Sequence, residues 1–258
     1  MAWGLAAILF GAVIGSFLNV CIYRIPQGKS LLHPGSHCPQ CGAGVRWYQN
    51  IPLVSYLILG GRCANCRTPI SIRYPLVEGL TGLIFLLVFL RFGFQPATLI
   101  YWIFVSTLVV ITFIDLDYQI IPDVISLPGI VVGFASSFFI PWLRWPDAVF
   151  GILLGGGSLY MVAAGYEFIT KKEGMGGGDI KLLAMIGAFM GWKAVLPIIF
   201  FSSLLGCLVG IPLMLIKKAD SKLAIPFGPF LAAAAIIFLL YGSRIVQEYL
   251  VFVGVSGP

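Results

Sequence analysis

The stretch PATLIYWIFVSTLVVITFI, residues 96–114, contains no charged side chain and runs directly into Asp115. As a helix with a rise of about 1.5 Å per residue, it is about as long as the roughly 30 Å hydrocarbon core of a bilayer is thick. The whole chain agrees with this stretch, because it is 59% hydrophobic, only 10% charged and has a mean hydropathy of +1.00. A soluble domain carries roughly a quarter charged residues. The composition therefore indicates a membrane protein.

Further apolar runs on both sides of this stretch give eight predicted spans. They cover residues 2–23, 76–92, 96–114, 124–143, 148–169, 180–192, 195–216 and 229–250. An open sheet cannot cross a bilayer, because its edge groups would lack hydrogen-bond partners, so the spans are helices. No Lys or Arg precedes Arg24, so we interpret the first run as a retained span rather than a signal peptide. The expected fold is an all-α polytopic membrane protein with about eight transmembrane helices and one small loop module, residues 24–75. We divide it into residues 1–23, the loop 24–75 and a membrane domain 76–258.

The basic residues predict the orientation of these spans. The net charge of +6 does not indicate nucleic-acid binding, since the cations lie between the spans rather than on one face. One side carries twelve of the 16 basic residues, namely Arg24, Lys29, Arg46, Arg62, Arg67, Arg73, Lys171, Lys172, Lys181, Lys217, Lys218 and Lys222. The other side carries Arg91, Arg144, Lys193 and Arg244. Because cytoplasmic loops are enriched in Lys and Arg, we expect the loop 24–75 in the cytoplasm and both termini outside it.

Four cysteines in this loop form two C-x-x-C pairs. Cys38 and Cys41 precede Cys63 and Cys66 by 21 intervening residues. Two such pairs supply the four thiolates of a closed, structural zinc site, and a metal stabilises a segment that is too short for a core of its own. Two disulfides, or unligated thiols, are the alternatives, although the reducing cytosol argues against disulfides. His37 could also replace one cysteine as a ligand.

Acidic residues are rare, yet they concentrate at two places. Asp115, Asp117 and Asp123 fall within nine positions, and Asp179 follows a run of glycines. The predicted topology puts both places at the cytoplasmic face. Two carboxylates in close contact share a proton, and one then acts as a base and the other as an acid, as in aspartic proteases. Ionisable groups beside apolar spans are costly, which makes Asp115 and Asp179 candidate catalytic residues.

The neighbouring residues receive supporting roles. Asp117 should point away from Asp115, since the two are separated by two positions on a helix. Asp123 is expected to cap the helix that follows Pro122. Asp179 lies at an expected helix start, where the dipole favours an anion, so we predict that it is the more acidic member. The glycines Gly174, Gly176, Gly177 and Gly178 allow an extended substrate to approach the backbone, but a loop with a helix-capping Asp explains them equally well.

At this point the residues resemble a known family, the bacterial type IV prepilin peptidases, which are membrane aspartyl proteases of the GxGD type. The resemblance covers nearly the whole chain. It is carried by residues 15–26 (GSFLNVCIYRIP), the paired C-x-x-C loop, 50–52 (NIP), 55–56 (SY), 73–79 (RYPLVEG), 115–117 (DLD), 121–123 (IPD), 176–181 (GGGDIK) and 225–230 (IPFGPF).

The resemblance implies two activities and a set of residue roles. A peptidase would remove a short basic leader after a Gly, and a methyltransferase would then methylate the new N-terminal residue with S-adenosylmethionine. The resemblance assigns the catalytic pair to Asp115 and Asp179. Because members without the cysteine loop tend to be peptidases only, the four cysteines imply the bifunctional type. It also implies the bacterial inner membrane and prepilin or pseudopilin substrates of pili, type II secretion or competence systems.

The methyl-donor site is not identified by any glycine-rich nucleotide loop. Polar residues near the first loop are candidates by location, namely Asn19, Asn50, Ser55, Arg73 and Glu78. Their ordinary roles would be interface anchoring and helix capping. Three other functions compete with the bifunctional enzyme: a monofunctional leader peptidase, a proton-coupled transporter, and a zinc-bearing scaffold of a pilus or secretion machine. A transporter predicts carboxylates near the bilayer midplane and an inverted repeat, and the sequence has neither. The oligomeric state stays open.

Overall fold

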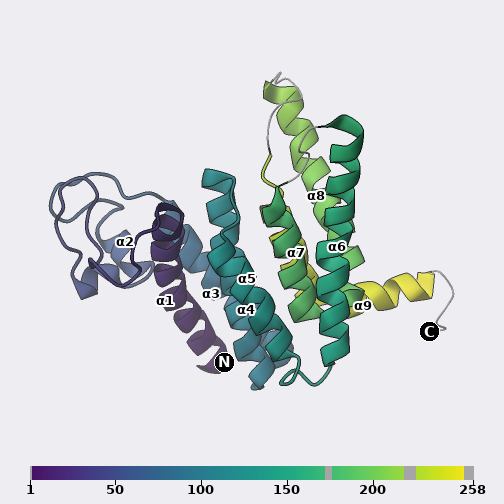
Figure 1. The fold of residues 1–258 in the computed structure, drawn as a ribbon. Coiled ribbons are helices and arrows are strands. Elements are labelled where there is room, and N and C mark those ends of the chain that lie inside the picture. The colour runs from purple at the N-terminus through teal and green to yellow at the C-terminus, as the bar shows by residue number, and fades with distance from the viewer. Residues whose placement is uncertain (1, 172–175, 218–224, 253–258) are drawn as a thin grey trace. The chain divides into compact units, whose positions relative to one another are not determined.

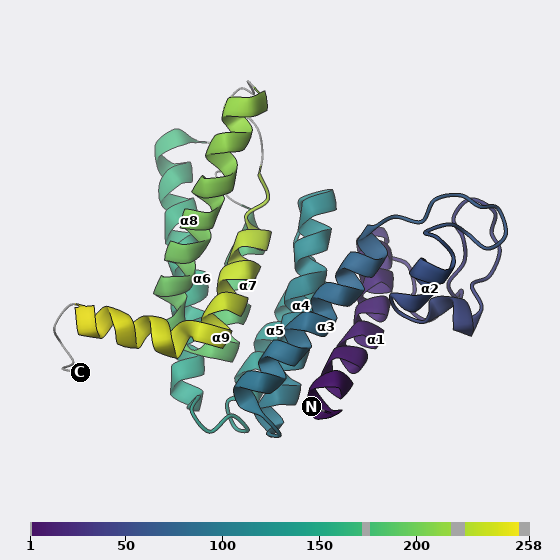
Figure 2. The same cartoon turned by 180° about the vertical axis from the view of Figure 1, so that it is seen from behind.

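The computed structural model describes residues 2–171, 176–217 and 225–252. Within these ranges the chain is helical, and the only β-pairings are two isolated bridges, His37 with Gly44 and Arg62 with Pro69. The helices fall into two compact units, residues 1–110 and 111–258 (Figures 1 and 2). The first is named the loop unit and the second the carboxylate unit.

The loop unit contains α1 (Ala2–Arg24), η1 (Ile25–Gln27), η2 (Trp47–Asn50), α2 (Val54–Ile58), α3 (Arg73–Phe92) and most of α4 (Pro96–Tyr118). Glycines bring α1 and α3 together, since a Cβ built on Gly15 would lie 2.7 Å from the Cα of Glu78. Small residues allow such close backbone approach in membrane helix pairs. The Asn19 amide joins the same pair by donating to the Tyr74 carbonyl at 3.1 Å.

The carboxylate unit holds the end of α4, then α5 (Asp123–Ser136), α6 (Trp145–Thr170), α7 (Gly177–Met190), α8 (Trp192–Lys217) and α9 (Gly228–Phe252). Helix α7 packs against α5, α6, α8 and α9, and every residue from Leu182 to Phe189 is buried. A helix that is apolar on all sides is expected in such an interior position. The backbones of Gly151 on α6 and Gly187 on α7 touch directly. Helix α7 is thus the core of this unit.

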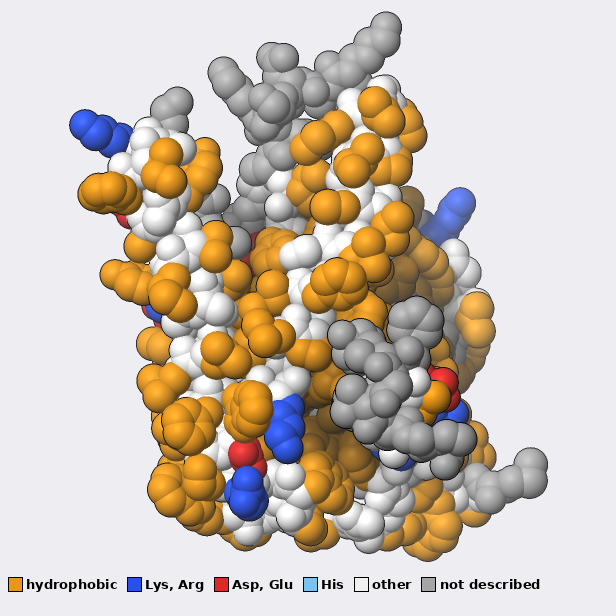
Figure 3. Space-filling view, turned by 90° about the vertical axis from the view of Figure 1, so that its right-hand side faces the viewer, with side chains coloured by type: hydrophobic (Ala, Val, Ile, Leu, Met, Phe, Trp, Pro, Cys, Tyr) orange, Lys and Arg blue, Asp and Glu red, His pale blue; other side chains and the backbone are white. Residues whose placement is uncertain are grey.

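All eight predicted spans correspond to helices. Six of them, α1, α3, α4, α6, α8 and α9, are long and apolar enough to cross a membrane. Large apolar side chains stay exposed on their surfaces, such as Leu9 on α1 at 59% and Phe200 on α8 at 64%. The face in Figure 3 is dominated by hydrophobic side chains with few charges, as a lipid-facing surface requires. The protein is a multi-pass membrane protein.

Two of the eight helices are shorter than the rest. The helices α5 and α7 have 14 residues each. The predicted span 124–143 is wrong at its end, because α5 stops at Ser136 and the chain turns before Pro141. Pro128 lies inside α5, within its first two turns.

The Gly151–Gly187 contact gives a test of the packing. We expect Gly187→Ala to lower the melting temperature in detergent, because its Cβ would collide with the α6 backbone at Gly151; overpacking of this kind costs about 1–3 kcal/mol. Gly157→Ala on α6 is the matched control, since nothing lies within 4 Å of a Cβ built there. This control should keep or raise stability, and equal melting temperatures for the two variants would contradict the packing.

Candidate functional site

Asp115 lies near the end of α4 and is only 5% exposed. Its Oδ2 accepts a hydrogen bond of 3.0 Å from the backbone N–H of Gly228, the first residue of α9. This approach requires glycine, because a Cβ at Gly228 would lie 2.6 Å from the same oxygen. The N-terminus of a helix carries partial positive charge and favours an anion. The start of α9 therefore fixes the position and orientation of the Asp115 carboxylate.

Asp179 occupies the first turn of α7 and lies outside the six candidate spans. Its Oδ1 is buried and has no hydrogen-bond partner in the described part of the chain. Burial and, second, the negative charge of Asp115 raise the pKa of Asp179 to about 6. The helix start was predicted, but the prediction that Asp179 is the more acidic member of the pair is wrong, because burial and the charge of Asp115 both raise its pKa. Two carboxyl groups that interact electrostatically, one fixed and one prone to hold a proton, can perform acid–base hydrolysis.

Ile121 joins the segments that carry the two carboxyl groups. A Cβ built on Gly178 would lie 2.8 Å from the Ile121 Cβ, and one built on Gly228 would lie 3.3 Å from its Cδ1. The Ile121 side chain thus packs against the residue before Asp179 and against the residue that binds Asp115. Sequence reasoning missed both Ile121 and Gly228 as site residues. The feature of the sequence that could have drawn attention to them is the proline that follows each one, in Ile121-Pro122 and in Phe227-Gly228-Pro229.

The other two acidic residues of this region, Asp117 and Asp123, are not part of the pair formed by Asp115 and Asp179. Asp117 is exposed, as predicted for a residue two positions from buried Asp115. Asp123 does not cap α5, because the N-cap position is Pro122 and no side chain bonds there. Both Asp123 carboxylate oxygens instead accept from the Lys181 ammonium, at 2.7 and 2.8 Å. The pair links the start of α5 to the first turns of α7. It is partly exposed, so its contribution to stability is below about 1 kcal/mol.

The glycines before Asp179 differ in what they do. Gly176 is the N-cap residue of α7 and has extended backbone angles, φ −69° and ψ 140°. Gly178 packs closely against Ile121, and a side chain at this position would collide with it. Gly174 lies outside the described residues. A helix start with one close packing contact accounts for Gly176 and Gly178.

The four loop cysteines converge in the loop unit. The sulfur atoms of Cys38, Cys41, Cys63 and Cys66 lie within 4.8 Å of one another, and the Cys38 and Cys66 sulfurs are 3.8 Å apart. With Zn–S bonds of about 2.3 Å, a tetrahedral site requires sulfur–sulfur distances of about 3.8 Å. All four are free cysteines rather than disulfides. The donor set therefore fits a tetrahedral metal ion.

Each C-x-x-C pair sits in the same type of turn. The Cys38 N–H donates to the Ala43 carbonyl, and the Cys63 N–H donates to the Thr68 carbonyl, both at 2.9 Å. The residue after each second cysteine has positive φ, +69° at Gly42 and +62° at Arg67. These turns aim both sulfurs of a pair at one point.

Groups near two of the four sulfurs, those of Cys41 and Cys66, favour the thiolate form that metals bind. The Thr68 side chain and backbone lower the pKa of Cys66 to about 6. The Ala43 backbone N–H, with the Asn65 amide at 3.6 Å, lowers the pKa of Cys41. His37 lies outside the cluster of four sulfurs, and its Nδ1 lies 3.0 Å from the Gly35 carbonyl oxygen.

Comparisons with known proteins agree with this division into two parts. Residues 9–92 match the Bacterial Peptidase A24 N-terminal domain, and residues 102–211 match the Type IV leader peptidase family. A "Prepilin leader peptidase/N-methyltransferase" of Pseudomonas aeruginosa is 39% identical, over 98% of this chain and 96% of its own. Proteins of the same name share 39% identity in Aeromonas hydrophila and 40% in Neisseria gonorrhoeae. These two alignments cover 94% and 91% of this chain and 92% and 89% of the relatives.

No solved structure matches the chain. The sequence matches nevertheless span both units, and the leader-peptidase model includes Asp115 and Asp179 while the N-terminal model includes all four loop cysteines. This protein belongs to the type IV leader peptidase family.

Proposed function

We propose that this chain cleaves the leader of type IV prepilins and related pseudopilins after Gly at the cytoplasmic membrane face, and then N-methylates the new N-terminal residue. The observation that carries the peptidase half is the pairing of buried Asp115 with half-buried Asp179 in one unit, with the charge of the first acting on the second. The methyltransferase half is supported by the name shared by the relatives, which cover both units. S-adenosylmethionine is the proposed methyl donor.

The two carboxyl groups have different proposed roles. Asp115 accepts a hydrogen bond from the Gly228 N–H, which holds its carboxyl group in place, and in the proposed mechanism it takes a proton from the attacking water. Asp179 holds a proton below its pKa of about 6 and gives it to the peptide carbonyl or the leaving amine. No covalent intermediate is needed. Asp117, Asp123, Gly176 and Gly178 have supporting roles, with Asp123 acting through Lys181 and Gly178 through Ile121.

The cysteine cluster is proposed as a structural zinc site. Cys38, Cys41, Cys63 and Cys66 would all be ligands, which leaves no open coordination position for chemistry. The metal would supply the free energy that holds the two turns together. We assign residues 24–75 to this zinc loop and residues 76–258 to the peptidase domain. The gathering of all four sulfurs favours the bifunctional enzyme over a peptidase that lacks the methyltransferase.

The proposed orientation places both sites at the cytoplasmic side of the bacterial inner membrane. It rests on the bias of Lys and Arg toward the loop 24–75 and toward the helix ends that carry Lys171 and Lys181. The substrates are then membrane-anchored prepilins whose basic leaders lie in the cytoplasm. The chain needs no nucleic-acid partner for this reaction.

The carboxyl pair gives the most direct test. Asp115→Asn and Asp179→Asn keep the size of each side chain but cannot exchange a proton, so each should reduce cleavage by about 10²–10⁴-fold. The double variant should be little worse than either single one, because the two groups act as a unit. The assay is prepilin cleavage by membranes with matched protein levels. Asp117→Asn and Asp123→Asn are the controls and should retain cleavage, whereas normal cleavage by Asp179→Asn would eliminate the mechanism.

The pH dependence tests the role of Asp179. Its raised pKa means that the proton is present below about pH 6 and is lost as the pH rises. If this proton reaches the leaving group, kcat/KM for cleavage should fall about tenfold per pH unit above the pKa. Asp117→Asn should leave the midpoint unchanged. Initial rates between pH 5 and pH 9 measure the profile, and a flat profile with unchanged protein stability would refute the acid role.

Metal content tests the zinc site. Purified protein should contain about one zinc per chain, and Cys38→Ser should lower that content, because the closed site needs four thiolates. Cys21→Ser is the matched control, as Cys21 is buried on α1 and is not in the cluster. Elemental analysis measures the metal. Disulfides among the four loop cysteines in freshly isolated protein would contradict the proposal.

A further inference from the structure

A cavity of about 1120 Å³ lies in the loop unit, between the loop and the ends of α1 and α3. Ligand pockets usually measure roughly 300–1,000 Å³, so this one admits a cofactor-sized molecule. Its walls include Cys38 and Cys63, which means that the cysteine cluster forms part of the cavity. The leader-peptidase model begins at residue 102 and covers none of these walls. The proposed carboxyl pair lies outside this cavity, whose walls end at Glu78.

Most polar groups in its wall are held by the fold. The Glu78 carboxylate is 7% exposed and accepts the Leu53 N–H at 2.8 Å, while the Ser16 hydroxyl also bonds to it. The Ser55 hydroxyl donates to the Tyr48 carbonyl at 2.9 Å. Asn19 donates its amide to main-chain carbonyls of α1 and α3. Three of the five residues suspected of binding the donor thus make structural contacts that shape the cavity.

The cavity offers suitable chemistry for a sulfonium cation attached to an aromatic base. Tyr23, Tyr56 and Tyr74 line it, and the face of a tyrosine ring attracts cations and stacks on bases. The Lys29 ammonium already lies 5.4 Å from the centre of the Tyr23 ring, which leaves Tyr56 and Tyr74 for the ligand cation. The buried carboxylate of Glu78 lies in the same wall. S-adenosylmethionine combines these two features.

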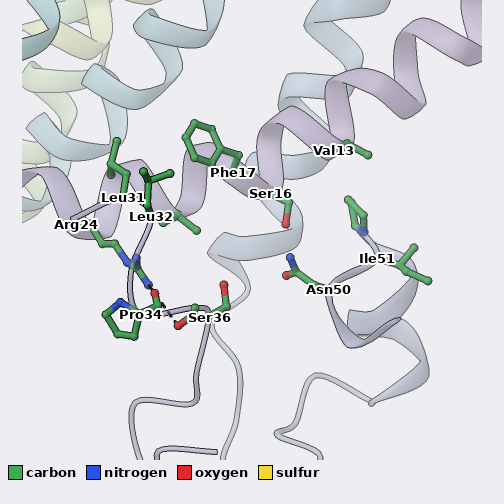
Figure 4. A pocket seen from close by; sticks show the side chains of 13 residues that line it. Val13, Ser16, Phe17, Arg24, Leu31, Leu32, Pro34, Ser36, Asn50 and Ile51 are labelled. Carbon is green, nitrogen blue, oxygen red and sulfur yellow. Dashed lines mark hydrogen bonds between the residues drawn. The ribbon is translucent and has the colours of Figure 1, made fainter. Parts of the chain in front are cut away.

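A second, smaller pocket of about 500 Å³ adjoins the cavity (Figure 4). One side is apolar, with Phe17 from the exposed face of α1 near Leu31 and Leu32. Arg24 holds the loop beside this pocket by donating to the Ser30 and Pro34 carbonyls, at 2.9 and 2.6 Å. Phe17 is 49% exposed on a helix long and apolar enough to cross a membrane, so the pocket borders an apolar surface that suits an apolar segment of a substrate.

The two hollows share a wall. Ser16, Asn50, Ile51 and Ser36 line both of them. In Figure 4 the side chains of Ser16 and Asn50 point toward one another. Within the described residues the Asn50 side chain has no hydrogen-bond partner. An amide without a partner, at the junction of a polar cavity and an apolar pocket, is placed to bind a group that enters from either side.

We propose that methyl transfer takes place at this junction. S-adenosylmethionine occupies the large cavity, and the apolar N-terminal end of the cleaved substrate occupies the small pocket. The acceptor amine of the substrate donates a hydrogen bond to the side-chain carbonyl oxygen of Asn50. The inference rests on the proposed methyltransferase function. The lone pair of the neutral amine attacks the methyl carbon. The carbon–sulfur bond breaks, its electron pair stays on sulfur as the thioether, and the methylated ammonium gives a proton to water. An α-amino group has a pKa of about 8, so a sufficient fraction of the amine is neutral near pH 7 to attack the methyl carbon without a side chain that removes its proton.

The donor site is tested by direct ultraviolet cross-linking of S-adenosylmethionine labelled in its methyl group to the full, zinc-loaded chain in nanodiscs. Excess S-adenosylhomocysteine should prevent labelling, and peptide mapping should place the label on tyrosines of the large cavity, Tyr56 or Tyr74. Competed label found only outside residues 16–78 would overturn the inference. This readout does not depend on turnover.

The acceptor role is tested with Asn50→Ala. Methylation of a cleaved substrate should fall at least about tenfold, the effect of losing one hydrogen bond of about 1.4 kcal/mol. Donor cross-linking, zinc content and leader cleavage should stay normal. Leu57→Ala is the control, because Leu57 is 76% exposed on α2 and lines neither hollow, so it should retain all four properties.

The outcomes separate this inference from the function on which it rests. If wild-type protein cleaves but never methylates, the methyltransferase half of the proposed function fails. If the wild type methylates and Asn50→Ala methylates at the same rate, only the acceptor site proposed here is wrong. Loss of donor cross-linking together with zinc in Asn50→Ala would make Asn50 a structural residue, which also contradicts the proposal.

Discussion

The candidate peptidase site depends on one close approach, the hydrogen bond from the Gly228 backbone N–H to the Asp115 carboxylate. It joins two residues that are 113 positions apart in sequence, one on α4 and one on α9. The contact leaves no space for a side chain at Gly228, and the same lack of a side chain at Gly178 lets Ile121 pack against both segments. The geometry of the candidate site therefore depends on the absence of a side chain at two glycines, and the Asp115 carboxylate is held by a backbone N–H.

The membrane architecture was predictable because a bilayer imposes strong constraints on sequence. Each apolar run corresponds to a helix, and the largest error is the end of α5, where the chain turns after Ser136 although its composition stays apolar. Hydropathy measures whether a residue tolerates lipid, and it does not measure whether the helix continues. The cysteine cluster was also foreseeable, since the spacing within each C-x-x-C pair is a local property of a turn.

The details of the carboxylate site were not predictable in the same way. Local reasoning made Asp123 a helix cap, but its partner is Lys181 on another helix. Local reasoning also made Asp179 acidic, yet burial and the charge of Asp115 act in the opposite direction and are stronger. Ile121 and Gly228 carry no chemistry of their own, so no inspection of side-chain types would select them. All of these features arise from contacts between segments distant in sequence.

The shortness of α7 is possible because the helix is enclosed. A helix of 14 residues measures about 21 Å along its axis, less than the roughly 30 Å thickness of the hydrocarbon core. Because Leu182–Phe189 are buried among α5, α6, α8 and α9, protein rather than lipid surrounds this helix, and its length does not have to match the bilayer. A short enclosed helix can begin below the level at which longer, lipid-facing helices end. Asp179 in its first turn then has protein around it where a lipid-facing carboxyl group would have hydrocarbon.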